Sequence, residues 1–238
     1  MIADQPPRPA NIQIIVAINQ GRRPLTLEEP RVERLSPEEA RERFGKGLLA
    51  LDTRSPEAFG AGHVAGAMNV QLSSAEFEQR AGWMLPADGP VVLIPDGDEA
   101  AQGAIRKLAF VGLDQRVRGY VEMEAWESAG LPTAALPQIT VAELRDSLAG
   151  GIGVLDVRET SEWQEGHIAS ATHMNFKHLP ARLGEVRFGR EDRIAVICAT
   201  GMRSSTACSY LLRNGFRNLL NVMGGMGAWQ EAGYPTSV

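Results

Sequence analysis

Short apolar runs alternate with segments of helical periodicity along most of this chain. Four apolar runs have the length and bounding turn residues of buried strands, and they occupy residues 47–52, 90–94, 151–156 and 193–197. Residues 36–44 and 140–148 each open with Ser or Thr and carry Glu three positions later, the capping-box pattern of a helix start. Residues 204–215 have apolar positions at helical spacing and end at Gly. Strand alternating with helix predicts a parallel sheet that helices cover on both faces.

The same pattern occurs twice. The segment ALDTRSPEAFGAGHVAGAMNV (residues 50–70) aligns with VLDVRETSEWQEGHIASATHMNF (residues 154–176), and in both an Asp precedes a His by eleven positions. Further along, the trio Gly112, Trp126 and Pro132 recurs as Gly215, Trp229 and Pro235. The offset between the copies is 104 before the loop region and 103 after it. This period is far too long for a solenoid, so it predicts a tandem duplication of one domain.

The repeat sets the expected domain boundaries. We assign residues 1–33 to an N-terminal extension, 34–133 to the first domain, 134–137 to a linker and 138–238 to the second domain. The linker lies within the Pro-flanked segment LPTAALPQ. Each domain is expected to have an α/β fold, with ligands at the carboxyl ends of its parallel strands.

Composition narrows the possible functions. The chain has 238 residues, 44% of them hydrophobic and 22% charged, with a net charge of −5. An acidic balance offers no extended basic surface, so nucleic acid is not an expected partner. The N-terminus is too polar for a signal peptide, and no apolar run is long enough to span a membrane, so a cytoplasmic protein is expected. The histidines lack the company of other metal ligands, and no metal or organic cofactor is expected.

The most informative chemical motif begins directly after the predicted strand at residues 193–197. The segment CATGMRS comprises Cys198, Ala199, Thr200, Gly201, Met202, Arg203 and Ser204. A thiol becomes a nucleophile when it ionises, and backbone N–H groups, a helix N-terminus and a nearby cation all favour the thiolate. The loop supplies all three, since consecutive amides can surround the sulfur and Arg203 lies five positions after Cys198. The loop and the start of the following helix therefore predict a site for a small anionic group bonded to Cys198.

Several of the candidate residues also have a purely structural explanation. A cysteine that ends a buried strand is often only a small apolar side chain, and Cys208 is expected to be a core residue of this kind. Asp156, Arg158 and His167 resemble an acid–base set, but all three have equivalents in the first copy. Their persistence in both copies favours a scaffold role over a catalytic one.

The loop Cys198 to Arg203 resembles the six-residue active-site loop of the rhodanese sulfurtransferase family. LDVRETSEWQEGHIASA is similar to the Asp-x-Arg and Gly-His-Ile signature of that family, and NVMGGMGAWQEAGYP to its closing Gly-Gly, Trp and Gly-x-Pro pattern. The resemblance implies a five-stranded parallel sheet with flanking helices in each domain. It also implies that Cys198 takes a sulfane sulfur as a persulfide from thiosulfate or glutathione persulfide and passes it to a thiol or cyanide, with residues 199–204 binding the substrate.

The first copy lacks this chemistry. By the offset of 103, Pro95 stands where the second copy has Cys198, and Ala100 stands where it has Arg203. The loop reads PDGDEA, which adds negative charge where an anion site needs positive charge. The first domain is therefore expected to be catalytically inactive, with a structural or partner-docking role.

Two alternatives remain from the sequence. Cys-dependent phosphatases and arsenate reductases share the cysteine, the anion cradle and the arginine, but they usually place the arginine six positions after the cysteine. The second alternative is a sulfur-relay or scaffold module. Residues 6–30 are similar to the segment that joins a metallo-β-lactamase-type persulfide dioxygenase domain to tandem rhodanese domains in fused proteins, so such a dioxygenase is a candidate partner.

Overall fold

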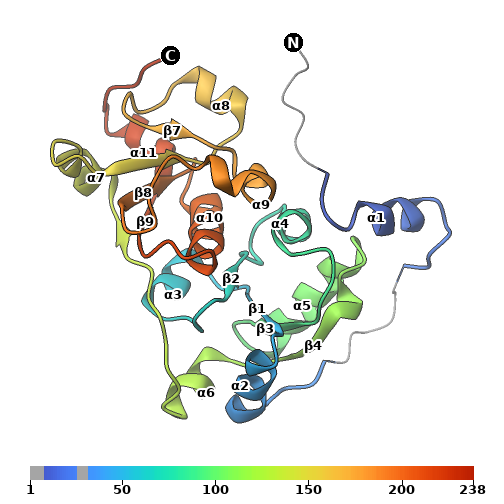
Figure 1. The fold of residues 1–238 in the computed structure, drawn as a ribbon. Helices are drawn as coiled ribbons and strands as arrows, with labels where there is room; N and C mark the ends of the chain where they lie inside the picture. The colour runs from blue at the N-terminus through green and yellow to red at the C-terminus, as the bar shows by residue number, and fades with distance from the viewer. Residues whose placement is uncertain (1–7, 26–31) are drawn as a thin grey trace. The chain divides into compact units, whose positions relative to one another are not determined.

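The computed structural model describes residues 8–25 and 32–238. The expected extension at residues 1–33 is therefore described only in part, and residues 1–7 and 26–31 lie outside the described chain. Within it, α1 (Ile12–Asn19), labelled in Figure 1, belongs to the first unit. The Asn11 side-chain amide, just before α1, donates to the carbonyl of Val111 at 2.7 Å.

The chain forms two structural units. The first runs to Ser55 and continues from Gly62 to Ala134, and the second contains Pro56–Ala61 and Ala135–Val238. The second unit thus includes α3 (Pro56–Ala61), a segment that the boundaries expected from the sequence assign to the first copy. A hydrogen bond of 3.1 Å from the Leu136 amide to the Gly60 carbonyl joins this segment to the start of the second unit.

The first unit contains a parallel sheet of order β2-β1-β3-β4. Its strands are β1 (Leu49–Asp52), β2 (Met68–Asn69), β3 (Val91–Ile94) and β4 (Val117–Tyr120). Its helices besides α1 are α2 (Pro37–Gly45), α4 (Phe77–Met84), α5 (Asp98–Ala109) and α6 (Met123–Ser128), with a 3-10 turn, η1 (Asp114–Arg116). All residues of β1 and β3 are buried, as expected of central strands in a doubly covered parallel sheet.

Among the described residues, this first sheet has four strands where five were expected. Next to β4, where a fifth strand would lie, one parallel bridge pairs Arg34 with Tyr120. The extended segment ends there because Ser36 caps α2 and Pro37 is its first residue, and proline has no N–H to continue a ladder. The capping box predicted for this helix is confirmed, since the Glu39 amide donates to the Ser36 hydroxyl and the Ser36 amide to the Glu39 carboxylate.

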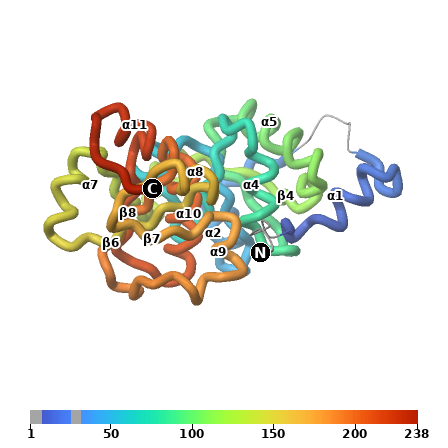
Figure 2. Tube along the Cα trace, turned by 90° about the horizontal axis from the view of Figure 1, so that it is seen from above, coloured from blue at the N-terminus to red at the C-terminus, as the bar shows by residue number. Residues whose placement is uncertain are grey.

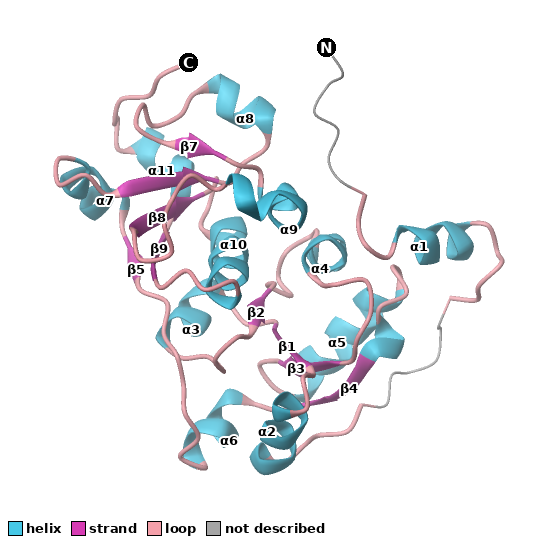
Figure 3. Ribbon diagram, viewed as in Figure 1, coloured by secondary structure: helices cyan, strands magenta, loops and turns pink. Residues whose placement is uncertain are grey.

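The second unit contains a five-stranded parallel sheet of order β5-β9-β8-β6-β7, as expected. Its strands are β5 (Gln138–Ile139), β6 (Gly153–Asp156), β7 (Thr172–His173), β8 (Arg193–Ile197) and β9 (Asn218–Val222). Its helices besides α3 are α7 (Val141–Leu148), α8 (Thr160–Glu165), α9 (Leu179–Arg182), α10 (Met202–Arg213) and α11 (Gly225–Glu231), with 3-10 turns η2 (Phe176–His178) and η3 (Leu183–Glu185). Figure 3 separates these strands and helices by colour.

Helices cover both faces of this sheet (Figures 1 and 2). On one face, Leu144 of α7 and Trp229 of α11 pack against Ala195 and Ile197 of β8. Side chains alternate along a strand, so Ile194 and Val196 point to the other face, where α10 contacts β8 and β9.

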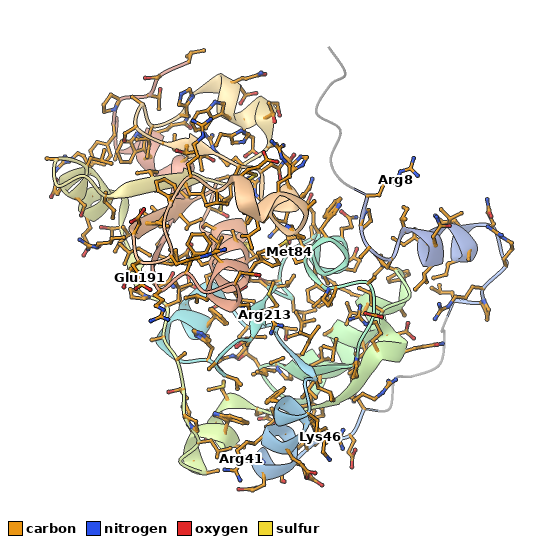
Figure 4. All side chains as sticks on the ribbon, viewed as in Figure 1. Arg8, Arg41, Lys46, Met84, Glu191 and Arg213 are labelled. Carbon is orange, nitrogen blue, oxygen red and sulfur yellow. The ribbon has the colours of Figure 1, made fainter. Side chains whose placement is uncertain are left out.

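The central strand β8 determines where the cysteine loop lies. It is hydrogen-bonded to β6 on one side and to β9 on the other, and it ends at Ile197. The next residue is Cys198, and α10 begins at Met202. Figure 4 labels Glu191, which precedes β8, and Arg213, which ends α10. Both lie at the ends of these elements that are away from the loop. Among the described residues, no helix has the length and apolar character needed to cross a membrane.

Candidate active site

The Cys198 sulfur lies in a polar setting although the residue is fully buried. The Gly201 amide donates to Sγ at 3.1 Å, and the Ser204 hydroxyl oxygen lies 3.4 Å from it. The same hydroxyl lies 2.6 Å from Oδ1 of Asn221. A serine has one hydroxyl hydrogen, so it serves the sulfur or the amide oxygen at any moment.

Two features of the chain turn bring these donors to the sulfur. Gly201 has φ of 101°, in the left-handed region where a side chain is strained, and it is the N-cap of α10. The twelve-residue helix that starts at Met202 directs its positive end and free N–H groups toward the loop. The arrangement favours negative charge at the Cys198 sulfur.

The start of α11 holds the loop from the other side. The Met226 amide donates to the Cys198 carbonyl at 2.7 Å, and the Gly227 amide donates to the Ala199 carbonyl at 3.0 Å. Gly225 has φ of 56°, and a Cβ built there would lie 2.2 Å from the Cys198 carbonyl oxygen. Only glycine fits at this approach, and the two bonds fix the peptide groups of the loop.

Arg203 is held by a carboxylate and does not hydrogen-bond to the sulfur. Its Nη1 and Nη2 donate to the two oxygens of Glu162 at 2.6 and 2.7 Å, a bidentate pair with 14% of the Arg203 side chain exposed. Burial acts to lower the pKa of Arg203, but the bond to Glu162 and the nearby Cys198 outweigh burial and raise it. Burial likewise acts to raise the pKa of Glu162, and the bond from Arg203 lowers it overall.

Glu162 also belongs to the start of α8. Its carboxylate accepts a hydrogen bond of 3.0 Å from the Glu159 amide, and its carbonyl accepts one of 3.0 Å from Arg158. Glu159 in turn pairs with Lys177 at 2.6 Å, and its carboxylate accepts a hydrogen bond of 2.6 Å from the side-chain amide of Asn175. The N-cap and the first turn of α8 therefore carry one carboxylate each, and each is paired with a cation.

The Asp156–Arg158 pair is a separate, buried feature. Nη2 of Arg158 lies 2.7 Å from Asp156 and also donates to the Gly166 carbonyl at 2.8 Å. Asp52 and Arg54 form the same arrangement in the first copy, with an ion pair of 2.6 Å. In both copies the pair joins the end of a strand to the turn before the following histidine.

The predicted loop residues occupy distinct places. Cys198, Gly201 and Ser204 come together around the sulfur, and Ala199 contributes its carbonyl to the bond with α11. Thr200 is exposed, and Met202 is partly buried at the start of α10. Among the loop amides, that of Gly201 donates to the sulfur.

Sequence reasoning missed three contributors, namely Glu162, Gly225 and Asn221. The signal available for Glu162 was its equivalent in the first copy, Ala58, which is lost together with the arginine. Gly225 lies in the motif NVMGGMGAWQEAGYP, but the motif alone does not show which atoms Gly225 approaches.

Cys208 lies one helical turn after Ser204 and is completely buried. Burial raises its pKa, and the nearby Cys198 adds to the effect. Cys208 therefore remains a thiol, as a core residue does.

The corresponding loop of the first unit lacks these groups. Pro95 follows β3 where Cys198 follows β8, and α5 begins at Asp98, one position earlier in the alignment than α10. The Tyr120 hydroxyl donates to the Asp98 carboxylate, and burial together with this bond raises the pKa of Tyr120 to about 12. In the described part of the chain, no group of three His, Cys, Asp or Glu side chains is placed to hold a metal ion.

Comparison with known proteins agrees with the repeat. The sequence model of the rhodanese-like domain matches residues 36–129 and 140–232. A sulfurtransferase of Allochromatium vinosum is 33% identical over 82 residues, which are 34% of this chain and 75% of the relative. Thiosulfate sulfurtransferase GlpE of Shewanella oneidensis is 31% identical over 84 residues, 35% of this chain and 81% of the relative. A rhodanese-related protein of Thermoplasma volcanium, known from its crystal structure, is 35% identical with a TM-score of 0.39, covering 42% of this chain and 97% of that one.

The two matched segments together span most of the chain, one in each copy of the repeat. Relatives that each cover about one copy are named sulfurtransferases. The chain therefore belongs to the rhodanese-like domain family and carries two such domains in tandem.

Proposed function

We propose that the second domain is a sulfurtransferase whose nucleophile is Cys198. The observation that carries the proposal is the setting of the sulfur, which meets the Gly201 N–H, the Ser204 hydroxyl and the start of α10 at the end of a central strand. These donors favour a thiolate and a bound persulfide anion. The proposed donors are thiosulfate and glutathione persulfide.

The reaction proceeds in two displacements. The Cys198 thiolate attacks the outer sulfur of thiosulfate, a new S–S bond forms, and sulfite leaves with the electron pair of the old one. With an organic persulfide, the leaving group is the thiolate. An acceptor thiolate or cyanide then attacks the outer sulfur of the Cys198 persulfide and releases the Cys198 thiolate. No step oxidises or reduces the protein overall, since the sulfane sulfur is transferred with its oxidation state unchanged.

The first domain is proposed to be catalytically inactive. Pro95 and Ala100 replace the nucleophile and the arginine. Its proposed role is to dock a partner, and the resemblance of residues 6–30 suggests a metallo-β-lactamase-type persulfide dioxygenase, which would consume a persulfide as its substrate. Retention of such a dioxygenase by the immobilised full chain, and its loss on charge reversal in the PDGDEA loop, would support this role.

Intact-mass measurement tests the transfer directly. The full chain is incubated with thiosulfate or glutathione persulfide, desalted and weighed, and the Cys198→Ser and Cys208→Ala variants are treated in parallel. We expect one added sulfur atom on the wild type and on Cys208→Ala, and none on Cys198→Ser. Addition of sulfur to Cys198→Ser would contradict the proposal. A failure of both donors to add sulfur to any of the three proteins would contradict it as well.

A further inference from the structure

Three cations on the Cys198 loop, at the start of α8 or on the neighbouring turn η2, each face a carboxylate, and we call this group of pairs the rim of the loop. Arg203 pairs with Glu162, Lys177 pairs with Glu159, and the more deeply buried Arg158 pairs with Asp156. An anionic donor that approaches the sulfur therefore meets neutralised pairs. The rim differs in this respect from an anion site built on an unpaired arginine.

The internal repeat separates the pairs that serve the scaffold from the pair that accompanies the nucleophile. The first copy keeps Asp52 and Arg54 in the same buried geometry as the second. It has Ala58 where the second copy has Glu162, and Ala100 where the second has Arg203. The fold therefore does not need the Glu162–Arg203 pair, and both members are absent from the copy that lacks the cysteine.

The guanidinium of Arg203 already binds a carboxylate. Two of its N–H groups form a parallel fork to both Glu162 oxygens at 2.6 and 2.7 Å. A sulfonate or sulfate group would need a comparable fork, so it must displace the carboxylate or bind beside it. Thiosulfate carries its charge directly next to the transferred sulfur, whereas an organic persulfide can carry its charged groups several bonds away.

We propose that Glu162 is a specificity-determining residue that holds Arg203 and cancels its charge, so that the loop disfavours compact dianionic donors relative to organic persulfides. This inference rests on the proposed sulfurtransferase function. Glu162 acts through Arg203 and does not itself touch the sulfur, so it is a positioning residue. Replacement of Glu162 should free the Arg203 guanidinium to bind an anionic donor.

Alkylation of Cys198 gives a readout that does not depend on turnover. Iodoacetate and iodoacetamide present the same reactive carbon, but only the first carries a negative charge. The ratio of their rate constants at one pH therefore reports the charge near the sulfur, with intact mass confirming a single adduct. Glu162→Gln should raise the iodoacetate-to-iodoacetamide ratio about fivefold at low ionic strength, and high salt should reduce this effect.

Three further variants make the measurement specific. Arg203→Gln leaves Glu162 uncompensated and should lower the ratio, and the double variant should return close to the wild-type ratio. Glu165→Gln removes the same charge from an exposed position at the other end of α8, and it should leave the ratio within about twofold of wild type. If Glu162→Gln slows both reagents equally or leaves the ratio unchanged, Glu162 only supports the structure and the proposal is wrong.

Donor kinetics complete the test. Glu162→Gln should raise kcat/KM for thiosulfate about fivefold through a lower KM, with a smaller change for glutathione persulfide. A uniform gain or loss with both donors would overturn the proposal. If wild-type protein gains no sulfur from either donor, the sulfurtransferase function fails instead, and the alkylation ratios still report whether Glu162 controls the charge at Cys198.

Discussion

Replacement of Gly225 by Ala tests how the start of α11 holds the cysteine loop. The new Cβ would lie 2.2 Å from the Cys198 carbonyl oxygen and 2.6 Å from the Ala199 carbonyl carbon. Both atoms belong to the backbone, so relief requires the loop or α11 to move. We expect Gly225→Ala to destabilise the second domain and to abolish sulfur transfer, because the loop amides lose their orientation.

The magnitude follows from three contributions. A non-glycine residue at φ of 56° costs about 1–2 kcal/mol. Movement of the loop breaks the bonds from Met226 and Gly227 to the Cys198 and Ala199 carbonyls, each with a net contribution of about 1 kcal/mol. The expected loss in the free energy of unfolding is therefore about 3–4 kcal/mol, a large part of the stability of a typical domain.

Gly215→Ala is the matched control. Gly215 also has a positive φ, of 89°, but a Cβ built there has no neighbour within 4 Å. It should lose only the conformational contribution of about 1–2 kcal/mol and keep full activity. Urea unfolding followed by tryptophan fluorescence and circular dichroism measures both variants, with equal slopes required for the comparison. If Gly225→Ala costs no more stability than Gly215→Ala, or transfers sulfur normally, the start of α11 does not hold the cysteine loop as described.

Three further outcomes are expected. Cys208→Ala should form the Cys198 persulfide within about twofold of the wild-type rate. It should lose about 1 kcal/mol of stability, since it removes one small buried group. A large loss of the persulfide, measured by intact mass, would show that Cys208 takes part in the transfer. Asp52→Asn should lower the free energy of unfolding by about 3–5 kcal/mol in urea titrations, because it leaves Arg54 buried without its carboxylate. A cost below 1 kcal/mol would argue against a scaffold role. The folded-state pKa of Glu162 is lowered, so its stabilisation is present above the ordinary glutamate pKa and is lost as pH falls through the lowered value. The difference in melting temperature between wild type and Glu162→Gln should therefore shrink between pH 6 and about pH 3, and a constant difference would contradict the linkage.

Local features of the fold could be predicted from the sequence because they depend on neighbouring residues. The capping boxes at Ser36 and Thr140 have both hydrogen bonds in place. The apolar runs are buried strands, and the continuous apolar character of residues 193–197 matches a central parallel strand. The repeat also located the two rhodanese-like domains, since duplicated spacings survive when individual residues change.

The cysteine loop was predictable for a similar reason. Cys198 and the residues up to Ser204 are contiguous, so their position between a strand and a helix follows from the pattern alone. The hydrogen bond from the Gly201 amide to the sulfur spans three residues and forms within the turn. In the described part of the first sheet, α2 starts early and leaves one bridge, between Arg34 and Tyr120, at the place expected for the fifth strand.

The sequence by itself determined the two copies, their strands and the loop that carries Cys198. Only the tertiary structure decided what surrounds that loop. Glu162 is 41 positions from Arg203 in the chain, and it reaches the guanidinium because β6 pairs directly with β8 and so places the start of α8 beside the loop. Gly225 approaches the Cys198 carbonyl because β9 lies on the other side of β8 and leads into α11. Such contacts depend on the order of strands in the sheet, which local periodicity does not specify.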